Sequence, residues 1–447
     1  MEQSQTALPT SARQWHRRVW KLAGPIILSN MSVPLVGAVD TAVVGHLPDP
    51  IFIGAVALGA IIFNFLFWGF GFLRMGTTGF VAQAYGADDP TEVRSTLARA
   101  LLLAAGFGLA VIALRGPIGV LAFWAFEGSA PLESLADSYY VIRVWSAPAA
   151  LANYAVLGCL IGIQNTRAAL ALQLVLNATN VLLDLVFVLA LGWGVEGVAI
   201  ASLLSEYLAL AFGLVIVGRY LQRSGGEWNR SHILYMPRLK ALLHVNFNIF
   251  VRTLCLIFAF FYFTAQGTKL GEITLAANAV LMHLQYFLAY GLDGFAHAVE
   301  ALAGGAYGAR NRSAFRAAVR VTTLWALVVA AVYALLYATL GTTIIGIITG
   351  IESVRLEAVR YLPWVLLSPI VSVWSYQLDG IFIGTTRPVE MRNGMLLSLL
   401  VFLIATWQLI PLWGNHGLWL SLMIFMVMRA LTLGLWFARI ERSMATT

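Results

Sequence analysis

Charged residues are scarce in this sequence, and their scarcity limits what kind of protein it can be. Only 11% of its 447 residues are Asp, Glu, Lys or Arg, whereas 60% are hydrophobic. Soluble globular domains carry roughly 25% charged and at most about 50% apolar residues. The composition therefore excludes a soluble globular protein and indicates a membrane protein with several spans.

Cysteine and the common catalytic motifs are also nearly absent. The two cysteines, Cys159 and Cys255, both lie in apolar runs, so neither a disulfide framework nor a cysteine metal site is expected. No His or Cys pair has a spacing that suits a metal. No G-x-x-x-x-G-K-[ST] motif is present, so ATP does not drive the protein, and nothing resembles a nucleophile elbow or a catalytic triad. We therefore expect neither an enzyme nor a bound cofactor.

Long apolar runs recur from about residue 21 to about residue 440, and about twelve of them meet the roughly 20-residue criterion for a membrane span. Continuous runs predict helices, since a barrel would show segments of about ten alternating residues. The expected fold class is thus an all-α polytopic membrane protein. The candidate spans lie near 21–46, 52–84, 96–122, 138–163, 168–191, 197–221, 242–266, 273–305, 317–348, 358–384, 391–411 and 417–440.

The distribution of Lys and Arg predicts the orientation in the membrane. If the termini and every second loop share one side, that side collects most basic residues. The other side then holds only Arg115, Lys269, Arg355 and Arg360. Cytoplasmic loops carry the excess of Lys and Arg, so both termini are expected to be cytoplasmic. The net charge of +7 then reflects topology and does not indicate a nucleic-acid partner.

The sequence also contains an internal duplication. The segment Gly54–Asp89 aligns without gaps with Ala276–Asn311, and both copies contain Ala-Tyr-Gly-Ala near their ends. Pro148 corresponds to Pro369, and a G-x-x-G pair opens both the sixth and the twelfth span. An even number of spans per copy gives both copies the same orientation. We therefore expect two six-helix bundles related by a pseudo-two-fold axis along the membrane normal, with a cavity between them.

This duplication predicts the domain organisation. We expect an N-terminal six-helix lobe over residues 1–222 and a C-terminal six-helix lobe over residues 242–447. The polar stretch at 223–241 is expected to be a cytoplasmic linker.

The first span carries the acid that we expect to be central. Asp40 lies in a run that also contains Pro25 and Pro34. A carboxylate at membrane depth costs about 3 kcal/mol on insertion scales, so it indicates function. Proline removes a helical hydrogen bond and allows a bend. A bendable helix with a buried titratable group is typical of an ion-coupled transporter.

The fifth and sixth spans supply polar partners for that acid. Asn177, Asn180 and Asp184 are spaced i, i+3 and i+7, on one helical face, and Ser202 and Glu206 of the sixth span can close a pocket around them. If Asp40 lies opposite Asp184, the two carboxyls cannot both ionise cheaply. Such a pair can take up and release a proton, or bind Na⁺ with amide and hydroxyl oxygens. The alternative is a purely structural hydrogen-bond network between helices.

A second group of candidates lies in the C-terminal half. Asp293, His297 and Glu300 are spaced i, i+4 and i+7 in the eighth span, near Tyr286, and Asp379 lies in the tenth span. They can form a second coupling site or bind a cationic substrate by charge and aromatic contact. The alternative is internal pairing, for example of Asp293 with Arg252.

Together these features resemble the multidrug and toxic compound extrusion (MATE) transporters. The segments GLDGFAHAVEALAGGAYGARN, QLDGIFIGTTRPVEMRN and VDTAVVGHL resemble the DinF branch, the DNA-damage-inducible bacterial members. The resemblance implies a two-lobed inner-membrane antiporter that exports organic, often cationic or amphipathic compounds against inward H⁺ or Na⁺ flow. It also implies that the family's coupling acid is Asp40, that its partners are Asn180 and Asp184, and that its small hydroxyl is Ser202.

The expected mechanism is alternating access. A proton from outside neutralises Asp40, its hydrogen bonds with Asn180 and Asp184 rearrange, and the first helix bends near Pro25 or Pro34, which expels the substrate. The expected partners are small organic molecules and membrane lipids, and the protein is expected to function as a monomer. The alternative is a flippase for a lipid-linked precursor, which needs a basic cavity for pyrophosphate. The carboxylate–amide cluster suits H⁺ and Na⁺ equally, so both are candidate coupling ions.

Overall fold

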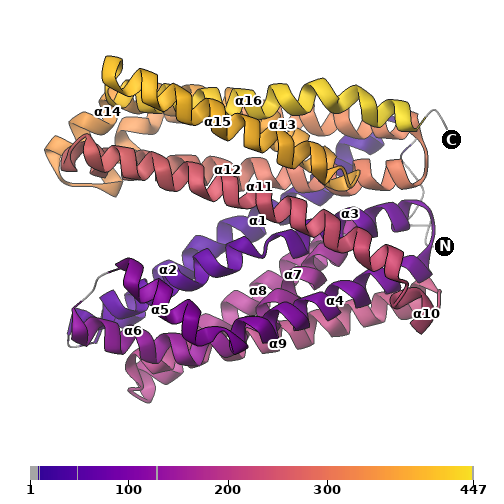
Figure 1. Cartoon of the computed structure of the whole chain (residues 1–447), viewed down its shortest axis with the longest axis horizontal. Coiled ribbons are helices and arrows are strands. Elements are labelled where there is room, and N and C mark those ends of the chain that lie inside the picture. Colours follow the sequence, from indigo (N-terminus) through magenta and orange to yellow (C-terminus); the bar gives the residue numbers. More distant parts are fainter. Residues whose placement is uncertain (1–8, 10, 48, 127–128, 445–447) are drawn as a thin grey trace. The chain divides into compact units, whose positions relative to one another are not determined.

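The computed structural model describes residues 9, 11–47, 49–126 and 129–444, and its regular structure there is helical. Twelve of the described segments are long and apolar enough to cross a membrane, which confirms the all-α fold class and the number of spans (Figure 1). In chain order the elements are α1 (Ala12–Val44), α2 (Ile51–Gly69), α3 (Phe72–Gly86), α4 (Pro90–Ala113), α5 (Arg115–Phe126), α6 (Ala130–Arg143), η1 (Val144–Ser146), α7 (Ala147–Gly162), α8 (Thr166–Asp184), η2 (Leu185–Ala190), α9 (Gly194–Ser224), α10 (Arg230–Ile233), α11 (Met236–Lys269), α12 (Glu272–Gly308), α13 (Arg312–Ile348), α14 (Glu352–Gly384), α15 (Pro388–Trp413) and α16 (Asn415–Ser443).

Several spans that read as single apolar runs are built from two helical segments. The second span breaks at Phe70 and Gly71 between α2 and α3, and the fourth passes from α6 through the 3₁₀ turn η1 into α7. In the fifth span α8 continues into η2, a π-helical segment. Single π-helical turns inside α-helices frequently mark functional sites. The third span ends at Ala113, and the separate helix α5 begins at Arg115 with Pro117 in its first turn, a favoured position for proline.

The duplication is visible in the backbone at the turns between helices. Non-glycine residues with positive φ, which cost about 1–2 kcal/mol each, occur at equivalent places in the two copies. Asp88 (φ 55°) matches Arg310 (φ 54°), and Gln164 (φ 61°) matches Thr386 (φ 50°). In the first pair the next residue caps the following helix. Asp89 accepts a hydrogen bond from the N–H of Glu92 at 2.9 Å, and Asn311 accepts one from Ala314 at 3.0 Å.

The glycine pairs that open the sixth and twelfth spans show the same correspondence. Gly194 (φ 55°) and Gly414 (φ 54°) both adopt the left-handed conformation. The second glycine of each pair approaches the backbone before the turn. A Cβ atom at Gly417 would overlap the carbonyl oxygen of Leu409, and one at Gly197 would lie 3.2 Å from the backbone of Phe187.

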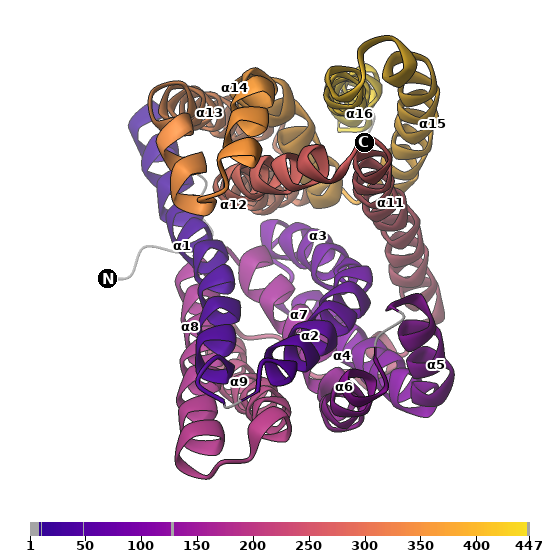
Figure 2. The same ribbon diagram turned by 90° about the vertical axis from the view of Figure 1, so that its left-hand side faces the viewer.

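The described residues form two compact units. The N-terminal unit contains Leu28–Tyr85 and Asp89–Leu242, and the C-terminal unit contains Gly86–Asp88, the described residues up to Ile27 and those from Leu243 onward. In the N-terminal unit α8 packs against α9, and α4 packs against α7 (Figure 2). In the C-terminal unit α12 packs against α14, and α15 packs against α16. The chain passes between the units inside α1, on either side of Gly86–Asp88, and inside α11.

The first part of α1 is fixed within the C-terminal unit. Trp325 donates a hydrogen bond from its indole nitrogen to His16 at 2.9 Å. Trp20 packs edge-to-face on Phe295, with the ring centres 5.4 Å apart, and on Trp325. Gly294 of α12 lets Ile27 approach so closely that a Cβ atom there would overlap the isoleucine side chain. α1 is therefore joined to α12 and α13 before it enters the N-terminal unit.

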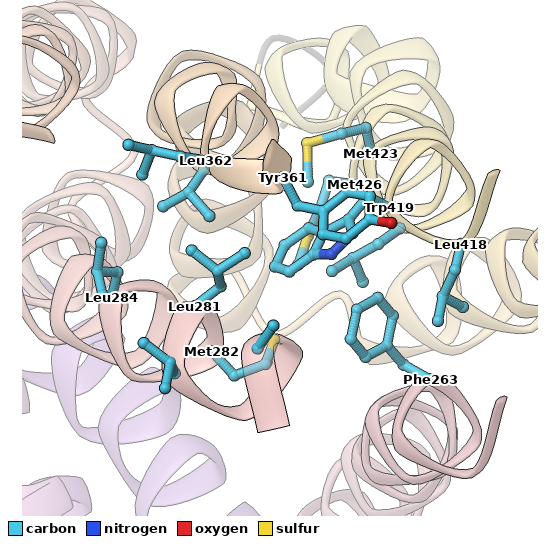
Figure 3. Packing of buried hydrophobic residues seen from close by; sticks show 14 of the residues in the cluster. Phe263, Leu281, Met282, Leu284, Tyr361, Leu362, Leu418, Trp419, Met423 and Met426 are labelled. Carbon is cyan, nitrogen blue, oxygen red and sulfur yellow. The ribbon is translucent and has the colours of Figure 1, made fainter. Parts of the chain in front are cut away.

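The core of the C-terminal unit combines aromatic and methionine side chains with one polar network. Phe263 packs edge-to-face on Trp419, near Met423 and Met426 (Figure 3). Asn278 and Asn415 exchange hydrogen bonds of 2.8 and 2.9 Å, and Trp419 donates to Asn278 at 2.8 Å. Burying these polar groups is tolerable because they satisfy one another.

The stretch expected to be a linker is bound to α4 within the N-terminal unit. Arg94 donates to the carbonyl oxygens of Leu221 and Gly225, the latter at 2.7 Å. Arg99 donates to the carbonyl oxygen of His232 at 2.6 Å and pairs with Glu92 at 2.8 Å. Both arginines are buried, so this stretch is held in place at several points.

Candidate functional site

Asp40 and Asp184 lie together in the N-terminal unit. Asp40 is near the end of α1, and Asp184 is the last residue of α8, directly before the π-helical segment η2. Their carboxyl groups lie close enough to act on each other electrostatically. In the described part of the chain neither oxygen of Asp184 has a hydrogen-bond partner. Because a carboxylate can only accept, this contact becomes a hydrogen bond only when one of the two carboxyls holds a proton.

Asn180 and Ser202 lie beside this carboxyl pair. Asn180 lies one turn before Asp184 on α8 and donates from Nδ2 to Oγ of Ser202 on α9 at 3.3 Å. Both side chains are buried, at 5% and 4% exposure. The structure therefore brings Asp40, Asp184, Asn180 and Ser202 together from three helices.

Tyr139 and Arg143 of α6 complete the site, and sequence reasoning did not place them there. The Tyr139 hydroxyl accepts a hydrogen bond from Nη1 of Arg143 at 3.0 Å and lies near the Ser202 side chain. The guanidinium of Arg143 lies close enough to act electrostatically on Asp40 and Asp184. An arginine inside a span is a signal in itself, since its cost in lipid requires a polar environment. The spacing of four residues from Tyr139 could have linked the two.

Glu206 of α9 is a third acid near Arg143. Its carboxylate accepts from Nδ2 of Asn153 at 2.8 Å, which joins α9 to α7. Arg143 also acts on it electrostatically. One cation thus serves three acids, and removing a proton from the carboxyl pair changes the balance of charge around Arg143.

Asn177 contacts α1, the helix that contains Pro25 and Pro34. Asn177 donates to Oγ of Ser32 on α1 at 2.8 Å and so joins α8 to α1 at a second point. α1 is helical through both Pro25 and Pro34. The chain leaves the C-terminal unit after Ile27, between these two prolines. Each proline lacks the N–H for the helical hydrogen bond, so this stretch is the weakest part of the α1 ladder.

Asp379 in the C-terminal unit is bound by two arginines. Its Oδ2 atom accepts from Arg429 at 2.6 Å and forms an ion pair with Arg252, and all three residues are buried. Arg252, which the sequence offered as a partner for Asp293, thus pairs with Asp379. A carboxylate held by two guanidinium groups is poorly suited to bind a cation.

The remaining candidates of the C-terminal unit lie along α12. Asp293 lies near Tyr290 and Tyr376, and Glu300 is fully buried. Tyr286 is 44% exposed, two turns before Asp293. Across the described ranges no group of three or more His, Cys, Asp or Glu side chains could hold a metal ion.

Comparison with known proteins identifies relatives over most of the chain. The MatE family profile matches residues 25–186 and 249–407. The chain is 42% identical over 432 residues to the DNA damage-inducible protein F of Escherichia coli (strain K12), and the match covers 94% of each chain. It is 26% identical over 439 residues to the chloroplastic Protein DETOXIFICATION 44 of Arabidopsis thaliana, covering 94% of this chain and 81% of that protein.

A solved structure shows the same fold over the whole chain. An outward-facing multidrug resistance transporter of the MATE family superimposes with a TM-score of 0.86 at 18% identity, covering 99% of this chain and 100% of that one. At this identity the likeness concerns the fold alone. With a family match over more than half of its length and a relative at 42% identity, the chain belongs to the MATE family of transporters, which are not enzymes.

Proposed function

We propose that this transporter exports small organic compounds, often cationic or amphipathic, from the cytoplasm in exchange for protons that bind at Asp40 and Asp184. The observation that carries the proposal is the pair of neighbouring carboxyls, of which Asp184 is fully buried and Asp40 half-buried. Neither oxygen of Asp184 has a hydrogen-bond partner in the described chain, so a proton shared with Asp40 is the simplest way to satisfy them.

The surroundings of the pair favour a proton over Na⁺. A proton binds to one carboxylate oxygen, whereas Na⁺ needs several oxygen ligands at the same time. Here the Ser202 hydroxyl already accepts a hydrogen bond from the Asn180 amide at 3.3 Å, which occupies one of the oxygen lone pairs that a Na⁺ ion would need. A Na⁺ ion held by Asp40, Asn180 and Asp184 is the competing assignment.

The coupling follows from the position of α1. Protonation removes a charge at Asp40, and the change can drive transport only if it stabilises one conformation of the protein over the other. Asp40 and Ser32 tie α1 to α8, whereas the stretch up to Ile27 is fixed on α12 and α13. A change in bend between Pro25 and Pro34 therefore transmits the protonation state along α1. For an uncharged substrate, one proton crossing 100 mV supplies about 2.3 kcal/mol, enough for a roughly fiftyfold substrate gradient. Exchange of one proton for one monovalent cation moves no net charge and draws on the pH gradient alone.

The C-terminal unit has a different role in this proposal. Asp379 is neutralised by Arg252 and Arg429, so we leave it out of coupling. Asp293 and His297, with Tyr286, are the candidates for contact with a cationic substrate through charge and aromatic faces, whereas Glu300 is fully buried and out of reach of a substrate. The acidic character of the N-terminal site disfavours the flippase alternative, because a pyrophosphate group needs a basic site.

The proposed setting is the bacterial inner membrane, with both termini in the cytoplasm, because the basic residues concentrate on that side. We propose that the protein functions as a monomer, with lobes at 1–222 and 242–447 and a cytoplasmic linker at 223–241.

The test is efflux of a fluorescent organic cation from proteoliposomes that contain the purified protein. A pH gradient alone, in Na⁺-free buffer, is expected to drive efflux and to be dissipated as substrate moves. Efflux driven by a Na⁺ gradient alone, with none under the pH gradient, would assign the coupling ion to Na⁺ and overturn the proton proposal.

A further inference from the structure

A crevice of about 980 Å³ opens in the C-terminal unit between α13, α14 and α16. Its volume is typical of a site for a sizeable organic ligand. The apolar part of its lining includes Leu327 of α13, Ile370 of α14 and Val427 of α16. None of the acids discussed above lines it, so the crevice is separate from the proposed coupling and substrate sites.

Gln377 is a polar side chain without a partner in the wall of this crevice. It is 2% exposed, and in the described part of the chain neither its Oε1 nor its Nε2 atom has a hydrogen-bond partner. A side-chain amide offers two donors and one acceptor oxygen. Leaving these unpaired in apolar surroundings costs several kcal/mol. A molecule in the crevice that brings a polar group to Gln377 would satisfy this amide, and its apolar part would cover the remaining walls of the crevice.

The depth of the polar residues indicates what that occupant is. α14 has 33 residues and is roughly 50 Å long at 1.5 Å per residue, whereas the hydrocarbon core is about 30 Å thick, so each end extends about 10 Å beyond it. Gln377 lies about 10 Å before the end of α14 at Gly384. Arg320 lies about 12 Å after the start of α13 at Arg312, at the same face of the membrane because the two helices are consecutive. Both side chains are thus at the boundary between hydrocarbon and headgroups.

The charge at the mouth of the crevice is positive. Arg320 is exposed and lines the crevice, whereas Arg316, one turn earlier, is held by Glu441 at 2.7 Å. An arginine at this depth can extend its guanidinium to a phosphate while its stem covers apolar surface. Gly434 of α16 leaves room beside it, because a Cβ atom there would have no other atom within 4 Å.

We propose that this crevice binds an acidic phospholipid of the surrounding membrane. One acyl chain lies against Leu327, Ile370 and Val427, a glycerol-ester group meets the amide of Gln377, and the phosphate binds Arg320. The lipid is that of the leaflet at the start of α13, which we assign to the cytoplasmic face. The amide, otherwise unsatisfied, makes the site selective for a molecule with polar groups at this one depth.

Native mass spectrometry of the purified full-length transporter tests the proposal, with phosphatidylglycerol and phosphatidylcholine added separately. The wild type is expected to retain phosphatidylglycerol preferentially. Arg320→Gln should lower that preference about fivefold, the share that one basic residue contributes to binding an anionic lipid. Gly434→Leu should reduce retention of both lipids, because its side chain enters the space beside Arg320 that the lipid headgroup occupies.

The thermal stability of Gln377→Leu, measured with and without phosphatidylglycerol, provides a second test, because a residue with a purely structural role would not change the response to lipid. In lipid-free detergent the substitution should raise the unfolding temperature, because an unpaired amide is replaced by an apolar group, and it should reduce the further stabilisation by phosphatidylglycerol. Arg439→Gln on α16 and Gly106→Leu on α4, both outside the crevice, are the matched controls, and gel filtration monitors folding. If Gly434→Leu does not fold, Arg320→Gln and Gln377→Leu decide the question.

Unchanged lipid preference in Arg320→Gln, together with no stabilisation of lipid-free protein by Gln377→Leu, would overturn the proposal. So would retention of an exported organic cation at this site in place of phospholipid.

Discussion

Arg429 donates to Oδ2 of Asp379 at 2.6 Å, and Arg252 forms an ion pair with that same oxygen atom. Two buried guanidinium groups therefore depend on one carboxylate. Removing one member of a buried charge pair is far more destabilising than the net contribution of the pair, because the remaining charge is left uncompensated. We therefore expect Asp379 to contribute to the stability of the fold and not to ion coupling.

Asp379→Asn is accordingly expected to lower the free energy of unfolding by about 3 kcal/mol or more. Thermal unfolding of the purified protein in detergent measures this. Replacing all three residues with Leu or Met is the control, since apolar side chains of similar volume should recover most of the loss. A variant with wild-type stability and abolished pH-driven efflux would instead place Asp379 in coupling.

Arg143 sets the pH range of transport in this account. Its positive charge favours the ionised form of the Asp40–Asp184 pair, so its removal lets the pair bind a proton at lower proton concentration. Arg143→Met should therefore shift the midpoint of the pH profile of efflux to higher pH by about one unit. Arg143→Lys keeps the charge and is expected to leave the midpoint close to that of the wild type. A shift to lower pH in Arg143→Met would contradict the placement of this charge.

Gly417 allows α16 to pack against the end of α15. A methyl group there would overlap the carbonyl oxygen of Leu409, so Gly417→Ala should cost about 1–3 kcal/mol of stability. Gly106 of α4 has no atom within 4 Å of its Cβ position, and Gly106→Ala should be neutral or slightly stabilising, by up to about 1 kcal/mol. Chemical denaturation of the two variants checks the contrast, and equal effects would refute it.

The stretch from Gly225 to Ile233 should be resistant to protease because Arg94 and Arg99 bind its carbonyl oxygens. Charge-assisted hydrogen bonds of this kind are worth about 1.5–3 kcal/mol. The double change Arg94→Ala and Arg99→Ala should therefore speed tryptic cleavage near Arg230 about tenfold or more. Arg316→Ala, the equivalent change in the second copy, should leave this cleavage rate unaltered, and protection that survives the double change would show another anchor.

Much of this architecture is readable from the sequence because it depends on local patterns. Apolar runs predict the twelve spans, since each must fill the hydrocarbon thickness alone. The i, i+3, i+7 spacing of Asn177, Asn180 and Asp184 predicts one helical face, and the structure brings the last two to Asp40. The matched turns at Asp88 and Arg310 follow the duplication.

Other features depend on contacts that no local pattern encodes. The sequence marks Arg143 only as an expensive residue in a span, because its neighbours come from α1, α8 and α9. From the sequence, Arg252 could pair with Asp293 or with Asp379. The packing of the helices brings it to Asp379. The breaks after Gly69 and Asp184 are invisible to hydropathy, since Phe70 and Leu185 are as apolar as helix interiors.

The most direct test of the central claim is pH-driven efflux by Asp40→Asn in proteoliposomes. Asparagine keeps the size of the side chain but cannot exchange a proton, so efflux under a pH gradient should fall at least about a hundredfold, while substrate binding to the detergent-solubilised protein persists. Asp137→Asn, an exposed acid on α6, serves as the control and should transport like the wild type. Undiminished pH-driven efflux by Asp40→Asn would contradict the account.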